Sequence, residues 1–276
     1  MRIGILGAGL MGGKLGTIFA RAGHEVVFSY ARSNEKLKKL ARDAKGDARA
    51  DTPSEAAKEA DAVLLAVHWS RIDEVLKQSG DLSGKVMLTC CLPMDSGNTK
   101  LIAGTTTSGA EELAKKAPKA RVVCAFNTVP SEVLFGVCEA RSKKSRPSLV
   151  YCGDDQSAKD VAAKLIDDAG FDAVDVGPLR IARYTEPFAL LVGEIAYNGE
   201  GGPRSRTASS DLRNRGAEHE ETALDQRSVF VCRYDGSDAV RQPGSGRRPA
   251  HSGPVCRSVA VGVARRARRR RGSSQG

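Results

Sequence analysis

Short apolar runs alternate with amphipathic segments through the first 200 residues, which predicts strands that alternate with helices. Unbroken apolar runs are typical of strands covered on both faces, and apolar positions three and four apart are typical of helices. We expect strands at residues 3–6, 25–29, 48–50, 62–67, 85–90, 121–126, 148–152 and 171–176. We expect helices at residues 10–21, 34–44, 70–78, 109–116, 157–169 and 184–197, with a further helix opened by Thr52 and Pro53.

The first predicted strand runs directly into the glycine pattern Gly7-x-Gly9-x-x-Gly12 and then into a helix. This context is the one that a dinucleotide fingerprint requires. Gly7 allows a tight turn, Gly9 lets a diphosphate approach the backbone, and Gly12 lets the helix pack on the strand. The alternation and the fingerprint together predict an α/β fold, a Rossmann-type doubly wound and mainly parallel sheet with a small C-terminal helical extension.

The end of the second predicted strand indicates which dinucleotide is preferred. An NAD site usually has a carboxylate there, about 20 residues after the glycines. Here the stretch from Ser29 to Asn34 contains Arg32 and two serines, and no carboxylate comes before Glu35. A guanidinium and hydroxyl groups would hold a 2′-phosphate, so we predict NADP(H). The alternative is that Arg32 is a solvated loop charge and that Ser33 or Asn34 caps the next helix.

Ligands of such sheets bind beyond the carboxyl ends of the strands. Those ends carry candidate residues by position, namely His68, Trp69, Leu92, Pro93, Asn127 and Thr128. The Gly-, Ser- and Thr-rich stretch at residues 94–108 is predicted to be a loop over the cleft. No His/Cys cluster or Cys-x-x-Cys spacing indicates a metal site.

Several stretches together resemble one known family, the deazaflavin-dependent NADP oxidoreductases (NADPH:coenzyme F420 reductase-like proteins). They are the glycine loop and the segments 66–69, 125–129, 152–155 and 175–179, within residues 1–202. The resemblance implies NADP(H) as cofactor, hydride transfer to a deazaflavin- or flavin-like small-molecule acceptor, and a homodimer. It places Gly7, Gly9, Leu10, Met11 and Gly12 at the diphosphate, Ser29, Arg32 and Ser33 at the 2′-phosphate, Val67 and His68 along the nicotinamide ribose, and Asn127 near the nicotinamide.

Hydride transfer between two ring systems needs few catalytic side chains, because the cofactors carry the chemistry. No catalytic residue is evident, and His68 is a weak candidate for proton transfer that is better interpreted as a ribose contact. Trp69 and the pair Cys90-Cys91 are interpreted as packing residues. Two alternatives stay open: an NADP-dependent imine or keto-acid reductase, and a dinucleotide-binding sensor without turnover.

The charge of the chain is concentrated in its last quarter. Residues 203–276 contain 16 Arg, no Lys and 7 acidic residues, which accounts for +9 of the net charge of +10. We therefore predict a domain at residues 1–202 and a low-complexity, disordered tail at 203–276. The absence of lysine beside so many arginines suggests that residues 203–276 are a frame-shifted end. The alternative is a basic arm that binds nucleic acid or an anionic membrane. We expect no signal peptide, membrane span or disulfide framework, and a cytoplasmic location.

Overall fold

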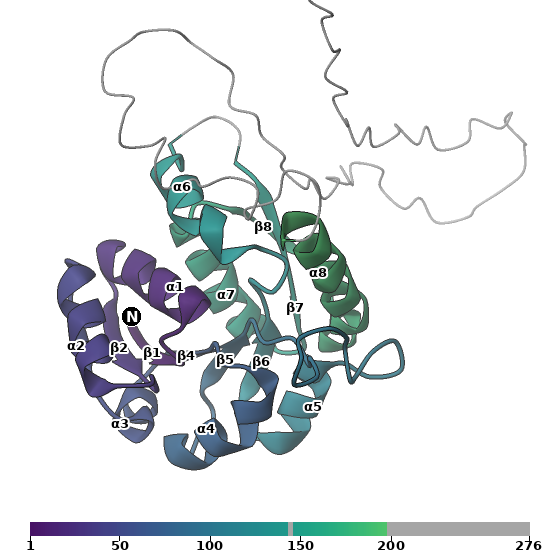
Figure 1. Cartoon of the computed structure of the whole chain (residues 1–276), viewed down its shortest axis with the longest axis horizontal. Helices are drawn as coiled ribbons and strands as arrows, with labels where there is room; N and C mark the ends of the chain where they lie inside the picture. Colours follow the sequence, from purple (N-terminus) through teal and green to yellow (C-terminus); the bar gives the residue numbers. More distant parts are fainter. Residues whose placement is uncertain (143–145, 198–276) are drawn as a thin grey trace, which may run out of the picture. The chain divides into compact units, whose positions relative to one another are not determined.

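The computed structural model describes residues 1–142 and 146–197, and within them an eight-stranded sheet forms the centre (Figure 1). The strand order is β3-β2-β1-β4-β5-β6-β7-β8. Neighbours from β3 to β6 pair in parallel, β7 is antiparallel to β6, and β8 is parallel to β7. The strands are β1 (Arg2–Leu6), β2 (Glu25–Ser29), β3 (Ala48–Ala50), β4 (Ala62–Leu65), β5 (Val86–Thr89), β6 (Arg121–Cys124), β7 (Ser148–Gly153) and β8 (Asp172–Asp175). The predicted doubly wound, mainly parallel α/β fold is confirmed.

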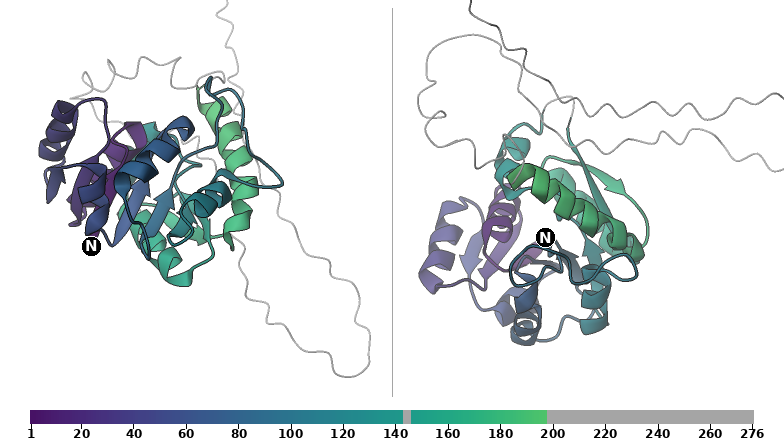
Figure 2. Two further views of the ribbon diagram at one scale, coloured as in Figure 1. Left: turned by 90° about the horizontal axis from the view of Figure 1, so that it is seen from below. Right: turned by 45° about the vertical axis from the view of Figure 1, so that its right-hand side comes forward.

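Helices lie on both faces of this sheet (Figure 2). One apolar cluster contains side chains of α1, α2, α6 and α7, and a second contains side chains of α3, α4, α5 and α8. The helices are α1 (Leu10–Arg21), α2 (Asn34–Asp43), α3 (Pro53–Lys58), α4 (Ile72–Ser79), α5 (Gly109–Lys116), α6 (Leu134–Glu139), α7 (Gln156–Asp168) and α8 (Ala182–Tyr197). Short 3-10 turns precede three of them: η1 (Trp69–Arg71), η2 (Ser131–Val133) and η3 (Leu179–Ile181).

Strand β4 shows why the central runs are apolar without a break. Ala62 and Leu64 face one cluster, Val63 and Leu65 face the other, and each is at most 1% exposed. Successive side chains of a strand point to opposite faces, so a strand with helices on both sides needs apolar residues at every position.

Three predicted helix starts have the expected capping geometry. The side chains of Ser33, Thr52 and Ser108 accept hydrogen bonds from the N–H groups of Lys36, Glu55 and Glu111, respectively. Such caps pair donors that the first helical turn leaves free. The serine or threonine thus fixes where each of these helices begins.

Helix α8 is joined to α5 by a buried carboxylate. Glu186 is 0% exposed, and its oxygens accept hydrogen bonds from the N–H groups of Gly109 (2.8 Å) and Ala110 (2.9 Å). Burial raises the pKa of Glu186 to about 7. Beside it, the Arg183 guanidinium donates two hydrogen bonds to the Glu111 carboxylate. The α5–α8 contact therefore depends on an acid that loses its proton near neutral pH.

Some local expectations need correction. Ser70 was expected to begin a helix, but η1 comes first, its start is capped by the His68 ring, and α4 begins at Ile72. Helix α6 was not expected, because six residues are too few to show a helical period. The predicted helix ending at Tyr197 begins earlier, at Ala182.

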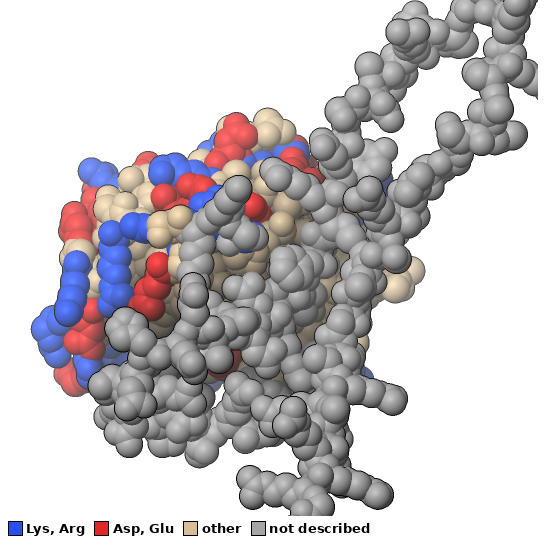
Figure 3. All heavy atoms as spheres, turned by 90° about the horizontal axis from the view of Figure 1, so that it is seen from above, with Lys and Arg blue, Asp and Glu red and all other residues tan. Residues whose placement is uncertain are grey.

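Other predictions fall on parts that the structure does not describe. The domain boundary at 202 and the tail at 203–276 lie outside the described residues. In residues 1–142 and 146–197, no helix combines the length and the apolar character needed to cross a membrane. The described surface visible in Figure 3 carries Lys and Arg side chains interspersed with Asp and Glu. This mixture agrees with the near-neutral charge of the first 202 residues.

Candidate nucleotide-binding site

The glycine loop between β1 and α1 has the geometry that the fingerprint predicts. Gly7 has φ +118°, and a Cβ there would lie 2.4 Å from the Ala66 carbonyl oxygen. A Cβ on Gly12 would lie 2.0 Å from the Gly7 carbonyl oxygen. These two positions need glycine for the fold itself. Gly9 differs, because no atom of the described residues lies within 4 Å of the place of its Cβ. Only Gly9 of the three leaves open space beside the backbone.

The start of α1 is open to an anion. Gly9 is its N-cap residue, no side chain of the described residues caps it, and its first turn contains no acidic residue. Leu10 follows with 70% of its surface exposed, and Met11 is half-buried. Unpaired N–H groups and the helix dipole at such a start favour a phosphate group. A helix start of this kind, without a side-chain cap or an acidic residue, can receive the diphosphate of a dinucleotide.

The end of β2 is held against the glycine loop. The N–H groups of Gly7 and Ala8 donate to the carbonyl oxygens of Ser29 (3.1 Å) and Tyr30 (3.0 Å). Tyr30 has φ +56°, a conformation that non-glycine residues rarely adopt and that often accompanies function. Ser29, however, is 0% exposed, and its hydroxyl donates to the Ile5 carbonyl oxygen at 2.8 Å. We therefore correct its predicted role: Ser29 fixes β2 to β1 and is not available to a phosphate.

Arg32 and Ser33 remain beside this end of β2. Arg32 is exposed, and within the described part of the chain its guanidinium has no ion-pair or hydrogen-bond partner. Ser33 caps α2, as the alternative interpretation expected, by accepting from the Lys36 N–H at 3.3 Å. Its exposed hydroxyl can still donate to a ligand. A free guanidinium and a hydroxyl therefore lie where the 2′-phosphate of NADP would bind.

Val67 and His68 follow β4 at the same edge of the sheet. Val67 packs against the glycine loop, since its Cγ1 lies 2.6 Å from the place of a Cβ on Gly7. His68 is exposed, and both of its ring nitrogens have partners. Nδ1 lies 2.9 Å from the Ser70 hydroxyl, and Nε2 lies 2.7 Å from Oδ1 of Asn98. Asn98 was not among the predicted residues, because it lies 30 positions away in the 94–108 loop.

The end of β6 contains buried polar atoms that no described residue satisfies. The amide oxygen and nitrogen of Asn127 and the hydroxyl oxygen of Ser131 are buried without a hydrogen-bond partner. Phe126, just before them, has φ +65°. Each unpaired buried polar group costs roughly 1–3 kcal/mol, so such groups mark places where a ligand or water binds. Sequence reasoning found Asn127 but missed Ser131, whose burial depends on the tertiary fold.

Among the other strand-end candidates, Trp69 and Pro93 make packing contacts. Trp69 is half-buried and packs against the second apolar cluster. Burial raises the pKa of the Cys91 thiol to about 11 and also raises that of Cys90, which are the properties of inert core cysteines. Leu92 and Pro93 follow at the end of β5, where Pro93 packs against Gly109.

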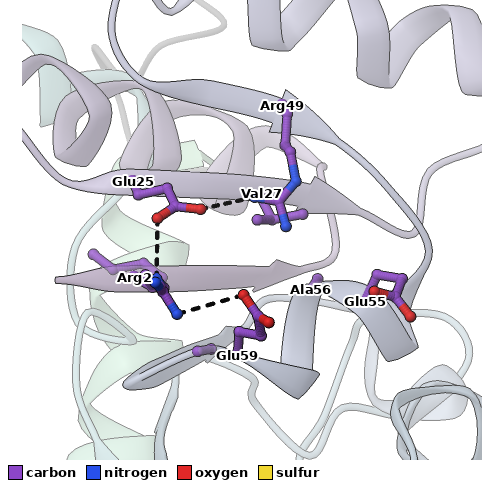
Figure 4. A pocket seen from close by; sticks show the side chains of 9 residues that line it. Arg2, Glu25, Val27, Arg49, Glu55, Ala56 and Glu59 are labelled. Carbon is purple, nitrogen blue, oxygen red and sulfur yellow. Dashed lines mark hydrogen bonds and ion pairs between the residues drawn. The ribbon is translucent and has the colours of Figure 1, made fainter.

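Two hollows among the described residues lie at the opposite edge of the sheet. Figure 4 shows one of about 10 Å³, enough for about one water, at the amino ends of β1 and β2. Its charges are already paired, Arg2 with Glu25 and Glu59, and Arg49 with Glu25. A second hollow of about 230 Å³ lies before β5 and β6, beside Leu76. Neither has a glycine loop or a helix start, so the carboxyl edge remains the better candidate.

The structure thus brings most predicted residues to one edge of the sheet, at the ends of β1, β2, β4 and β6. An open helix start and a bare glycine lie at this edge, and Ser131 is held to α1 because the Lys14 ammonium donates to its carbonyl oxygen at 2.9 Å. These features are typical of a dinucleotide-binding α/β protein. The resemblance found in the sequence is confirmed. Residues 2–93 match the model of the family described as NADP oxidoreductase, coenzyme F420-dependent, so this part of the chain is similar to that family.

Known proteins resemble this chain in sequence or in structure. A candidate F420-dependent NADP reductase from Arthrobacter sp. FB24 has the same fold, with a TM-score of 0.63, 23% identity, and coverage of 72% of this chain and 95% of that one. The hypothetical protein SMa0349 from Sinorhizobium meliloti gives a TM-score of 0.58, 27% identity, and coverage of 66% and 88%. Metalloreductase STEAP3 from Rattus norvegicus is 25% identical over 189 residues. The aligned part is 68% of this chain but only 36% of STEAP3.

Proposed function

We propose that this protein binds NADP(H) and catalyses hydride transfer between NADPH and a deazaflavin- or flavin-like acceptor. The observation that carries the proposal is the bare backbone at Gly9, beside the uncapped start of α1. The description of the matching family supports NADP as the cofactor. The identity of the acceptor is supported by the same description and by the resemblance in the sequence.

Different residues at the carboxyl edge would bind different parts of the cofactor. The N–H groups of Leu10 and Met11 would hold the diphosphate, and Gly9 would let it approach. Arg32 would pair with the 2′-phosphate, which carries about two negative charges that a guanidinium binds with two parallel hydrogen bonds. Asn127 would bind an amide-like group at the nicotinamide end, because its side chain offers a donor and an acceptor that are both unused.

The chemistry requires orientation more than acid–base catalysis. NADPH would supply the hydride, and the protein would hold the two ring systems in contact. His68 is a poor proton donor in the described structure, because Ser70 and Asn98 occupy both ring nitrogens. The site supplies positioned polar groups.

A comparison of two cofactors tests the proposal. We would titrate the full chain with NADPH and with NADH by calorimetry, for wild type, Arg32→Ala and Arg42→Ala. Arg42 is an exposed arginine in the last turn of α2 and serves as the matched control. Wild type and Arg42→Ala should prefer NADPH, and Arg32→Ala should lose that preference by about tenfold or more. An equal or stronger response of wild type to NADH would contradict the assignment of NADP(H).

Hydride transfer is tested by mixing NADPH with deazaflavin or with flavin and following the oxidation of NADPH. Oxidation of NADPH with either acceptor supports the enzyme proposal. Tight binding of NADPH without oxidation by either would instead favour a dinucleotide-binding sensor. The homodimer and the cytoplasmic location stay predictions, and the mass of the full chain in solution tests the first.

A further inference from the structure

A small turn at residues 95–100 follows β5 and is shaped by its own hydrogen bonds. The Asp95 carboxylate accepts from the Thr99 N–H (2.7 Å), the Thr99 hydroxyl (2.9 Å) and the Lys100 N–H (3.3 Å). The Asp95 N–H donates to the Lys100 carbonyl oxygen, and Met94 and Leu101 form a bridge at the base. Because residues 96–100 are exposed, these bonds hold the turn without help from packing.

Asn98 makes the contact between this turn and the nucleotide site. It has φ +55°, a left-handed conformation that asparagine tolerates better than most residues. Its Oδ1 lies 2.7 Å from Nε2 of His68, at the end of β4. Within the described part of the chain, the other hydrogen bonds of residues 95–100 stay inside the turn. One hydrogen bond therefore joins the turn to the cofactor side of the sheet.

The surroundings of His68 show the direction of that bond. The Ser70 N–H donates to Nδ1 at 3.3 Å, so in the neutral ring the proton is on Nε2. Nε2–H then donates to Oδ1 of Asn98. Both nitrogens are fixed, and the imidazole cannot rotate without losing a bond.

We propose that Asn98 is a positioning residue. Acting through His68, it fixes the imidazole and holds the 95–100 turn as a latch over the nicotinamide end of the cofactor. This inference rests on the proposed function, because it assumes that the nicotinamide ribose lies at Val67 and His68. The latch opens for a dinucleotide to enter and to leave, and a single hydrogen bond is weak enough for such opening.

The test measures binding rates in the full chain. Trp69 is the only tryptophan of the sequence and is next to His68, so its fluorescence reports the arrival of NADPH. Stopped-flow mixing would give the association and dissociation rates for wild type and three variants. Asn98→Gly removes the side chain but permits positive φ, and Asn98→Asp keeps an acceptor for His68. Lys100→Ala is the control, because it changes an exposed side chain of the same turn and leaves the hydrogen bond between Asn98 and His68 in place.

A latch predicts that Asn98→Gly raises both rates, each by about three- to tenfold, with an unchanged melting temperature. Lys100→Ala should keep the wild-type rates, and Asn98→Asp, whose carboxylate accepts a stronger hydrogen bond from His68, should not release NADPH faster than wild type. Calorimetry with 2′-phospho-ADP-ribose, which lacks nicotinamide, should give equal affinities for all four proteins. A residue with only a structural role would lower the melting temperature and change the affinity for both ligands.

Two results separate the failure of this inference from the failure of the proposed function. Unchanged association and dissociation rates of NADPH in Asn98→Gly would overturn the latch and leave NADP(H) binding intact. If the wild-type protein binds neither ligand, both the latch and the proposed function are wrong.

Discussion

Gly9→Ala separates binding from folding more sharply than any other change in the glycine loop. Gly9 has φ −79° and ψ −152°, an extended conformation that alanine adopts, and a new Cβ would meet no described atom within 4 Å. Reduced freedom of the unfolded chain favours alanine by about 0.4–1 kcal/mol, and a weaker N-cap offsets this by about the same amount. We therefore expect the free energy of unfolding to stay within about 1 kcal/mol of wild type.

We expect Gly9→Ala to reduce the affinity for NADPH much more than the free energy of unfolding. The new methyl group would occupy the space through which a diphosphate reaches the N–H groups of Leu10 and Met11. Loss of one hydrogen bond to a charged group costs about 1.5–3 kcal/mol, so the Kd for NADPH should rise about 10- to 150-fold. Calorimetry gives the Kd, and urea unfolding gives the stability.

Two other glycines complete the experiment. Gly136 in α6 also has open space around its Cβ position, so Gly136→Ala should bind NADPH normally and gain up to about 1 kcal/mol. Gly12→Ala should lose about 3 kcal/mol or more of stability, since its Cβ would lie 2.0 Å from a carbonyl oxygen. If Gly9→Ala folds and binds NADPH as wild type does, the diphosphate does not lie against this backbone.

Three further changes test the roles of buried groups. Glu186 keeps its proton to about pH 7 when folded but only to about pH 4.5 when unfolded, so it should lower stability by about 3 kcal/mol as pH rises between these values. Urea unfolding at several pH values should show this fall of stability in wild type but not in Glu186→Gln. If the free energy of unfolding changed equally with pH in both proteins, the role of the Glu186 proton would be contradicted. Ser29→Ala should cost about 1 kcal/mol of stability through the lost hydrogen bond to Ile5, and it should keep the preference for NADPH over NADH. Loss of that preference would show that Ser29 contacts the 2′-phosphate. Cys91 should react with a thiol reagent at pH 8 only after unfolding, as peptide mapping would show, and rapid labelling of the folded chain would refute its inert role.

The fold was largely predictable from local patterns. The strands at 25–29 and 48–50 and the start of α5 after Ser108 match, because apolar runs and capping residues act over a few positions. The antiparallel direction of β7 could not be assigned, since pairing depends on how the chain returns to the sheet. Helix α6 has too few residues for a periodic signal.

The parts of the candidate site that depend on spacing along the chain could be predicted from the sequence. The three glycines and Arg32 follow from distance along the chain, because one strand, turn and helix position them. Ser29 was assigned wrongly to the phosphate, since the pleat turns its hydroxyl toward Ile5. Asn98 was missed, because its contact joins residues 30 positions apart. Tertiary contacts of this kind leave no local pattern.

The most direct test of the central claim is a crystal structure of the full chain with NADPH bound. We predict density for the diphosphate against the backbone of Gly9 and Leu10, with the 2′-phosphate beside Arg32. The glycine loop needs no rearrangement for this, because the space at Gly9 is already open. NADPH bound at the opposite edge, near Leu76, or a cleft that stays empty at saturating NADPH would contradict the account.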